Sequence, residues 1–160
     1  YALHSLLSMT ALYLVIGRAK AMTGSWTLSA SGGIYTLAPG FAFLSLALFL
    51  AVAGLPPFSG LWPKIMLVKA SVDIGAWWLA AAILVSGFLS TIALGRAFLL
   101  AYWRPAPEVQ GGGRKPALPK ADWRSAAAIM ALAALIVWFG LFPEAPLSLA
   151  QQAAGGLLDP

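Results

Sequence analysis

A single lysine inside a long apolar stretch is the residue of this sequence best suited to chemistry. Lys64 lies seven residues after Pro57, and the residues around it, from 61 to 67, are otherwise apolar. A lysine at membrane depth costs at least about 2.5–3.5 kcal/mol on insertion scales. The same desolvation brings the charged and neutral amine closer in energy, so a lysine there can pass protons. The alternative is a structural lysine whose ammonium group snorkels to the membrane interface.

The one histidine of the chain lies among hydroxyl side chains of another apolar segment. His4 is accompanied there by Ser5, Ser8 and Thr10. Histidine can relay protons near neutral pH, which would give it a role in transfer. A lone histidine can equally be a structural residue that forms a hydrogen bond to a neighbouring helix. The residues alone leave both interpretations open.

Three further charged residues are possible charge partners within the apolar segments. Lys69 and Asp73 are four residues apart, a spacing that allows an ion pair on a helix. Since both lie near the expected membrane edge, snorkelling is the favoured interpretation of Lys69. Arg96 lies one to two turns before Tyr102 and Trp103, the aromatic end of its segment. It can reach the interface or pair inside the bundle, and its position favours neither.

Several classes of site are disfavoured by composition. The chain has no cysteine, one histidine and five acidic residues, too few for a thiolate site, a metal cluster or a nucleophile with its base. The run GGGRK over 111–115 lacks the spacing and hydroxyl of a phosphate-binding loop, so we interpret it as a flexible linker. The basic residues lie between apolar runs, which argues against nucleic-acid binding. We expect no cofactor, no metal and no enzyme.

The elements that position these residues are predicted to be membrane helices. Hydrophobic residues make up 61% of the chain and charged residues 9%, whereas a soluble domain has roughly 25% charged residues. The fold class predicted is all-α, a polytopic transmembrane helix bundle. Because the sequence begins at Tyr1, we expect the 160 residues to be one transmembrane domain from the C-terminal part of a longer subunit. The predicted helices span about 1–17, 39–55 continued by 58–72, 76–103 and 123–142, with an interfacial helix over 147–158.

The second apolar block is predicted to be broken in its middle. Residues 54–60 read GLPPFSG, in which Pro56 and Pro57 remove two backbone donors and Gly54, Ser59 and Gly60 flank them. The two halves could form one broken crossing or a hairpin. A single crossing gathers the basic residues on one side, which the positive-inside rule assigns to the cytoplasm, and it is the better fit. That side holds Arg18, Lys20, Arg104, Arg114, Lys115, Lys120 and Arg124; the other holds Lys69, Asp73, Glu144 and Asp159.

The stretch over 43–70, FLSLALFLAVAGLPPFSGLWPKIMLVKA, resembles a family of antiporter-like membrane subunits that carry the pattern GLPPxSGFxxK. The family includes the proton-pumping membrane subunits of respiratory complex I and the two large subunits of Mrp-type multisubunit sodium/proton antiporters. Three further stretches resemble the D-type member of those two large Mrp subunits. They are His4-Ser5-Leu6-Leu7 with 11–14, Arg96-Ala97 with Trp103, and the tail over 153–160.

The resemblance implies two inverted repeats, each with a broken helix, and a proton-transfer role for Lys64 and His4. It implies a multi-pass subunit in the plasma membrane that works with other membrane subunits, the lipid bilayer, protons and a monovalent cation. Alternatives are a subunit of complex I, where it would belong to an oxidoreductase, or of a related hydrogenase, and a non-conducting membrane anchor. The chain departs from the family pattern at Met9, where many relatives have lysine, and at Leu61 and Pro63 beside Lys64.

Overall fold

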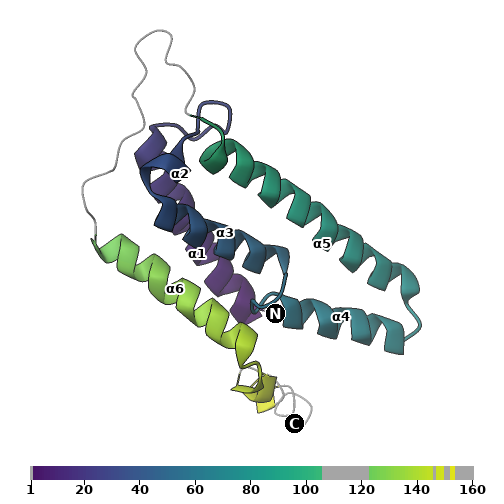
Figure 1. Cartoon of the computed structure of the whole chain (residues 1–160). Helices are drawn as coiled ribbons and strands as arrows, with labels where there is room; N and C mark the ends of the chain where they lie inside the picture. The colour runs from purple at the N-terminus through teal and green to yellow at the C-terminus, as the bar shows by residue number, and fades with distance from the viewer. Residues whose placement is uncertain (1, 106–122, 146, 150–151, 154–160) are drawn as a thin grey trace.

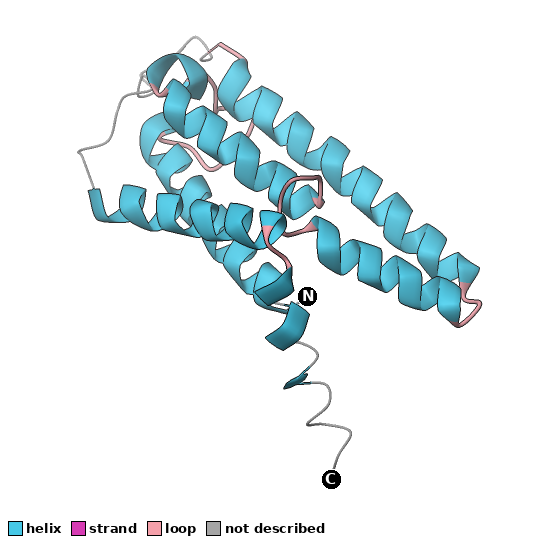
Figure 2. Ribbon diagram, turned by 60° about the horizontal axis from the view of Figure 1, so that its bottom comes forward, coloured by secondary structure: helices cyan, strands magenta, loops and turns pink. Residues whose placement is uncertain are grey.

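The computed structural model describes residues 2–105, 123–145, 147–149 and 152–153, and this part of the chain is helical without strands. Three segments are long and apolar enough to cross a membrane: 2–23, 77–103 and 123–141. The predicted all-α membrane bundle is therefore confirmed (Figures 1 and 2). Its elements are α1 (Ala2–Thr23), α2 (Ile34–Leu37), α3 (Pro39–Ala53), α4 (Leu61–Asp73), α5 (Trp77–Phe98), the π-helix η1 (Leu99–Trp103) and α6 (Trp123–Leu141).

Several predicted boundaries differ from the structure by one to three residues, and two further differences stand out. The first helix was expected to end near residue 17, but α1 continues to Thr23. The expectation was wrong because Arg18 and Lys20 have partners that let the helix carry them: Arg18 donates to Ser125 Oγ at 3.1 Å, and Lys20 Nζ lies 5.1 Å from the Trp26 ring. The α-helix expected over 76–103 becomes a π-helix after Phe98.

Helices α3 and α4 are the two halves of one interrupted crossing. Helix α3 ends at Ala53, and α4 begins at Leu61. Helix α5 runs beside both halves: α3 packs against its C-terminal part, and α4 against its first turns (Figure 1). A hairpin would have placed the two halves side by side, so the single broken crossing describes the structure.

Arg104 joins the loop after α1 to the end of η1 by hydrogen bonds. Arg104 Nη2 donates to the carbonyl oxygens of Leu28, Ser29 and Ser31 at 3.0, 2.8 and 2.7 Å, and its own carbonyl accepts from Gly33 N at 2.7 Å. The loop after α1 is thereby fixed to the end of η1. The predicted linker over 111–115 and most of the predicted interfacial helix over 147–158 lie outside the described residues.

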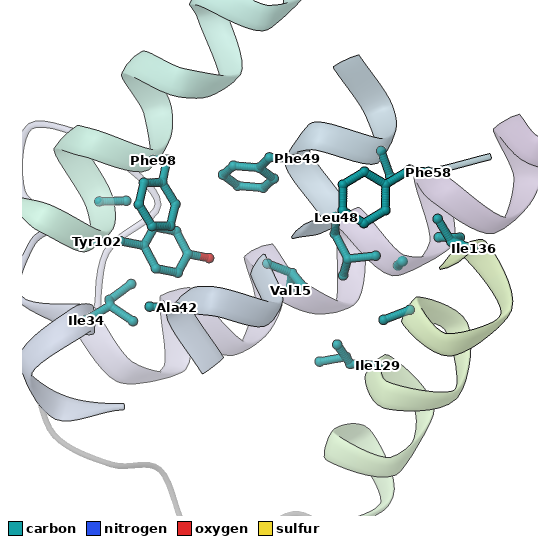
Figure 3. Close-up of a cluster of buried hydrophobic side chains, with 14 of the residues drawn as sticks. Val15, Ile34, Ala42, Leu48, Phe49, Phe58, Phe98, Tyr102, Ile129 and Ile136 are labelled. Atoms are coloured by element: carbon teal, nitrogen blue, oxygen red, sulfur yellow. The ribbon is translucent and has the colours of Figure 1, made fainter. Parts of the chain in front are cut away.

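The core joins α1, α3, α6 and the end of α5. Val15, Leu48 and Ile136 are almost fully buried at its centre, and Phe58 from the interrupted segment enters the same cluster (Figure 3). Beside it, Phe49 of α3 packs edge-on against Phe98 and Tyr102, with ring centroids 6.4 and 6.0 Å apart. Since lipid is as apolar as these side chains, close packing rather than exclusion from water holds them together.

We predict that Phe49→Ala lowers the thermal stability of the protein in detergent. The substitution removes two aromatic pairs, each worth about 0.5–1.5 kcal/mol, so we expect a loss of about 1–3 kcal/mol. Phe43→Ala on the same helix is the comparison, because Phe43 is 59% exposed and has one aromatic partner, Tyr35, whereas Phe49 is 7% exposed and has two. Equal melting temperatures for the two variants would contradict the packing described.

Candidate functional site

The candidate site is built around the non-helical segment 54–60 between α3 and α4. Gly54 adopts a left-handed conformation with φ 79°, which ends α3, and its N–H bonds back to the last turn of that helix. The Pro56–Pro57 peptide bond is cis. Leu61 N donates to Phe58 O at 3.2 Å, and α4 begins there. We call residues 54–60 the break.

Lys64 reaches from α4 back to the end of α3. Its Nζ donates to the carbonyl oxygen of Ala53, the last residue of α3. Two glycines give the side chain its room: a Cβ added at Gly54 would lie 2.7 Å from Nζ, and one added at Gly87 on α5 would lie 3.2 Å from it. The half-buried lysine borders a cavity of about 280 Å³ between α4 and α5, where Thr91 is the other polar side chain.

His4 contacts the other end of the break. Its Nδ1 shares a hydrogen bond with Ser59 Oγ at 2.9 Å, and Ser8 Oγ lies 3.3 Å from the same nitrogen. A Cβ added at Gly60 would lie 3.0 Å from the imidazole ring. The histidine therefore bonds to a neighbouring element, as the structural interpretation expects. That element is the break itself, so the relay interpretation stands beside it.

The break separates two cavities. The Lys64 cavity opens at Gly54 and Leu55, where α3 ends. A second cavity, of about 370 Å³, lies at Ser59, where α4 begins, and His4 lines it together with apolar side chains of α4 and α6. The two sequence-predicted polar residues thus lie in different cavities on either side of one short segment.

The structure does not bring the remaining predicted charge partners to the break. Lys69 and Asp73 form an ion pair of 2.8 Å on the outer part of α4, with side chains 75% and 57% exposed. Such an exposed pair contributes little to stability. Arg96 is exposed on α5 and has no ion-pair partner among the described residues. No group of three metal-ligating side chains occurs in the described part of the chain.

Sequence reasoning missed three residues of the site: Gly87 and Thr91 on α5, and Gly140 on α6. Each lies in an apolar helix, and the sequence pattern of such a helix does not predict which neighbouring helix a glycine or threonine faces. Only the positions of the neighbouring helices reveal that these residues adjoin the break.

The fold and the site define a class: a multi-pass membrane protein with a broken helix, of the kind that forms ion sites in transporters. Comparison with known families identifies the member within this class. The family described as "NADH:quinone oxidoreductase/Mrp antiporter, TM" matches residues 1–90, which contain α1, α3, the break and α4, and the chain belongs to this family.

Individual relatives come from both branches of that family. The chain is 28% identical to the D-type subunit of the Na(+)/H(+) antiporter of Bacillus subtilis (strain 168), over all of this chain and 31% of that protein. It is 34% identical to NADH-quinone oxidoreductase subunit 13 of Thermus thermophilus, over 82% of this chain and 26% of that protein. The chain therefore spans less than a third of the length of these relatives.

A solved structure has the same fold. A chain in the structure of the Mrp complex from Dietzia sp. DQ12-45-1b matches 99% of this chain with a TM-score of 0.83 and 24% sequence identity. The match covers 36% of that chain. The likeness confirms how the helices are arranged and carries no residue roles with it.

We predict that the pair His4→Cys and Ser59→Cys can be joined by a short thiol cross-linker. The two side chains are in hydrogen-bond contact, and the chain has no cysteine of its own to compete. The measurement is the yield of the intramolecular link in the membrane-embedded protein. Tyr13→Cys with Ser59→Cys is the control pair, because Tyr13 lies on the same helix but is 76% exposed. Equal yields from both pairs would reject the contact.

Proposed function

We propose that this chain is part of a membrane subunit of a multisubunit cation/proton antiporter of the sodium/proton type, and that it contributes part of a transmembrane proton path. The observation that carries the proposal is the ammonium group of Lys64 held at the broken end of a membrane helix. The proposal agrees with the name of the Bacillus subtilis relative and with the multisubunit complex of the Dietzia structure. Other membrane subunits, the bilayer, protons and a monovalent cation are the proposed partners.

Two opposing influences act on the protonation of Lys64. The carbonyl end of a helix carries partial negative charge, so the end of α3 at Ala53 favours the ammonium form. Loss of hydration favours the neutral amine. No carboxylate contacts Lys64 among the described residues, so the charged form has no ion-pair partner there. We propose that these opposing influences let Lys64 accept and release a proton.

His4 is the proposed second member of the path. Its hydrogen bond to Ser59 fixes the imidazole at the α4 end of the break, while Lys64 bonds at the α3 end. In the proposed sequence a proton leaves one group, crosses the polar backbone of the break with water that enters the two cavities, and reaches the other. The break would thus serve as the connection between two titratable side chains.

A second candidate function is proton pumping in an NADH–quinone oxidoreductase. The observation that favours it is the 34% identity to the Thermus thermophilus subunit. The same lysine and histidine would serve in both candidate functions, so the site does not distinguish them. The subunits that co-purify with the whole protein distinguish them: quinone-reducing partners would favour the oxidoreductase, and antiporter subunits alone would favour the first proposal. A non-conducting anchor fits less well, because Lys64 bonds to a helix end rather than extending freely.

We predict that Lys64→Ala in the complete protein abolishes proton-coupled cation exchange and leaves membrane insertion intact. Lys64→Arg should also be inactive, because a guanidinium group keeps its proton and cannot pass it on. Exchange is measured in vesicles by a pH-sensitive dye after cation addition. Lys69→Ala is the matched control on the same helix, since Lys69 is exposed and paired with Asp73. Full exchange by Lys64→Ala would end the proposal.

We predict that Gly87→Ala reduces exchange although it changes no titratable group. The added methyl would lie 3.2 Å from Lys64 Nζ, so the ammonium group, which bonds to Ala53 O, must give way by a few tenths of an ångström. We expect a severalfold loss, below the roughly 100-fold that a 1 Å misplacement can cause. Gly95→Ala on the same helix α5 is the control, since its methyl would meet nothing within 4 Å. The idea fails if the two variants exchange at the same rate.

A further inference from the structure

The break rests directly on the backbone of α6. Gly140, a buried residue of that helix, faces the main chain of Pro57 and Phe58. A Cβ added at Gly140 would lie 2.7 Å from Phe58 C and 2.8 Å from Phe58 Cα, and it would overlap the carbonyl oxygen of Pro57. These neighbours are backbone atoms within a compact turn, so they cannot move aside as the end of a flexible side chain can.

Two hydrogen bonds join α6 to the break and to the first turn of α4. Trp62 Nε1 donates to Gly140 O at 2.8 Å, and Ser59 N donates to Ile136 O at 3.3 Å. Because α6 ends at Leu141, the Gly140 carbonyl is one of the last four, which have no partner within the helix. The indole of Trp62 satisfies it. Helix α6 therefore holds the break through its backbone on both sides of Gly60.

Helix α6 also packs against α1, the helix that carries His4. The two helices are in contact, and Arg18 of α1 donates to Ser125 of α6 at 3.1 Å. The histidine is therefore fixed relative to α6. A displacement of the break from α6 would change the distance between Ser59 and His4, which is 2.9 Å between Oγ and Nδ1.

We infer that Gly140 is a positioning residue: the absence of a side chain there seats the break on α6 and so holds Ser59 in hydrogen-bond contact with His4. The effect on transport rests on the proposed function, whereas the effect on geometry does not. Gly140 itself carries no titratable group, so it acts only through the position of the break.

The test uses Gly140→Ala in the complete protein with two separate readouts. The first is the cross-linking yield of the His4→Cys and Ser59→Cys pair, which does not depend on transport. The second is exchange in the protein that retains His4 and Ser59, where we expect a loss between about tenfold and 100-fold. Gly17→Ala on α1 is the matched control, because a methyl there would meet nothing within 4 Å.

A second variant and a coupling measurement separate positioning from general damage. Trp62→Phe keeps a smaller aromatic side chain, removes the donor to Gly140 O and adds no atom to the contact, so it should lower both readouts to a smaller extent than Gly140→Ala. If Gly140 acts through Ser59, adding Gly140→Ala to Ser59→Ala should cause little further loss of exchange. A merely structural defect would instead add its full loss in both backgrounds.

Each result is decisive. The inference is supported if Gly140→Ala lowers the cross-linking yield and lowers exchange, and if its loss of exchange does not add to that of Ser59→Ala. Cross-linking equal to that of Gly17→Ala, in both Gly140→Ala and Trp62→Phe, overturns it. Additive losses of exchange also overturn it. If Lys64→Ala retains full exchange, the proposed function fails, and the cross-linking readout still decides whether Gly140 positions the break.

Discussion

The structure depends on the hydrogen bond between the Lys64 ammonium and the carbonyl oxygen of Ala53. Lipid offers no hydrogen bonds, so a helix that stops inside a membrane leaves carbonyl groups that must find partners within the protein. A lysine in the same region has the complementary problem, a charge without hydration. Each group supplies what the other lacks. The broken helix and the intramembrane lysine are therefore parts of one feature, joined by this hydrogen bond.

This reciprocal arrangement explains why glycines gather at the break. The lysine side chain can reach the helix end only if nothing occupies the space beside Gly54 and Gly87. The break itself can lie on α6 only if Gly140 leaves room for the main chain of Pro57 and Phe58. A methyl group at any of these positions would disturb the geometry of the break. The site therefore depends on the glycines that leave space as well as on its polar side chains.

The sequence predicts some of this arrangement well. The low fraction of charged residues is sufficient for the membrane class, and the double proline locates the break, since two missing donors cannot be accommodated in a helix. Lys64 stands out because its neighbours along the chain are apolar. These are local signals. The contacts of Gly87 and Gly140 depend on which helices adjoin the break, and the extension of α1 past Arg18 depends on a partner 107 residues away. Such long-range partners leave no trace in local spacing.

The helices around the break differ in how many of their side chains are buried, and this difference bears on how the site can work. Helices α1, α3 and α6 contribute most of the buried core, whereas α4 buries only Ser71 among its residues. His4 bonds to Ser59 where α6 holds the break, through Gly140 and the hydrogen bond from Ser59 N to Ile136 O, although both side chains border the larger cavity of about 370 Å³. Lys64 lies between α4 and α5, beside the cavity of about 280 Å³ bordered by Gly87 and Thr91. Lys64 has a long side chain whose one hydrogen-bond partner among the described residues is a backbone carbonyl, whereas His4 shares hydrogen bonds with two hydroxyl side chains. For the proposed proton path, we therefore propose that the lysine moves during transfer and that the histidine keeps its place.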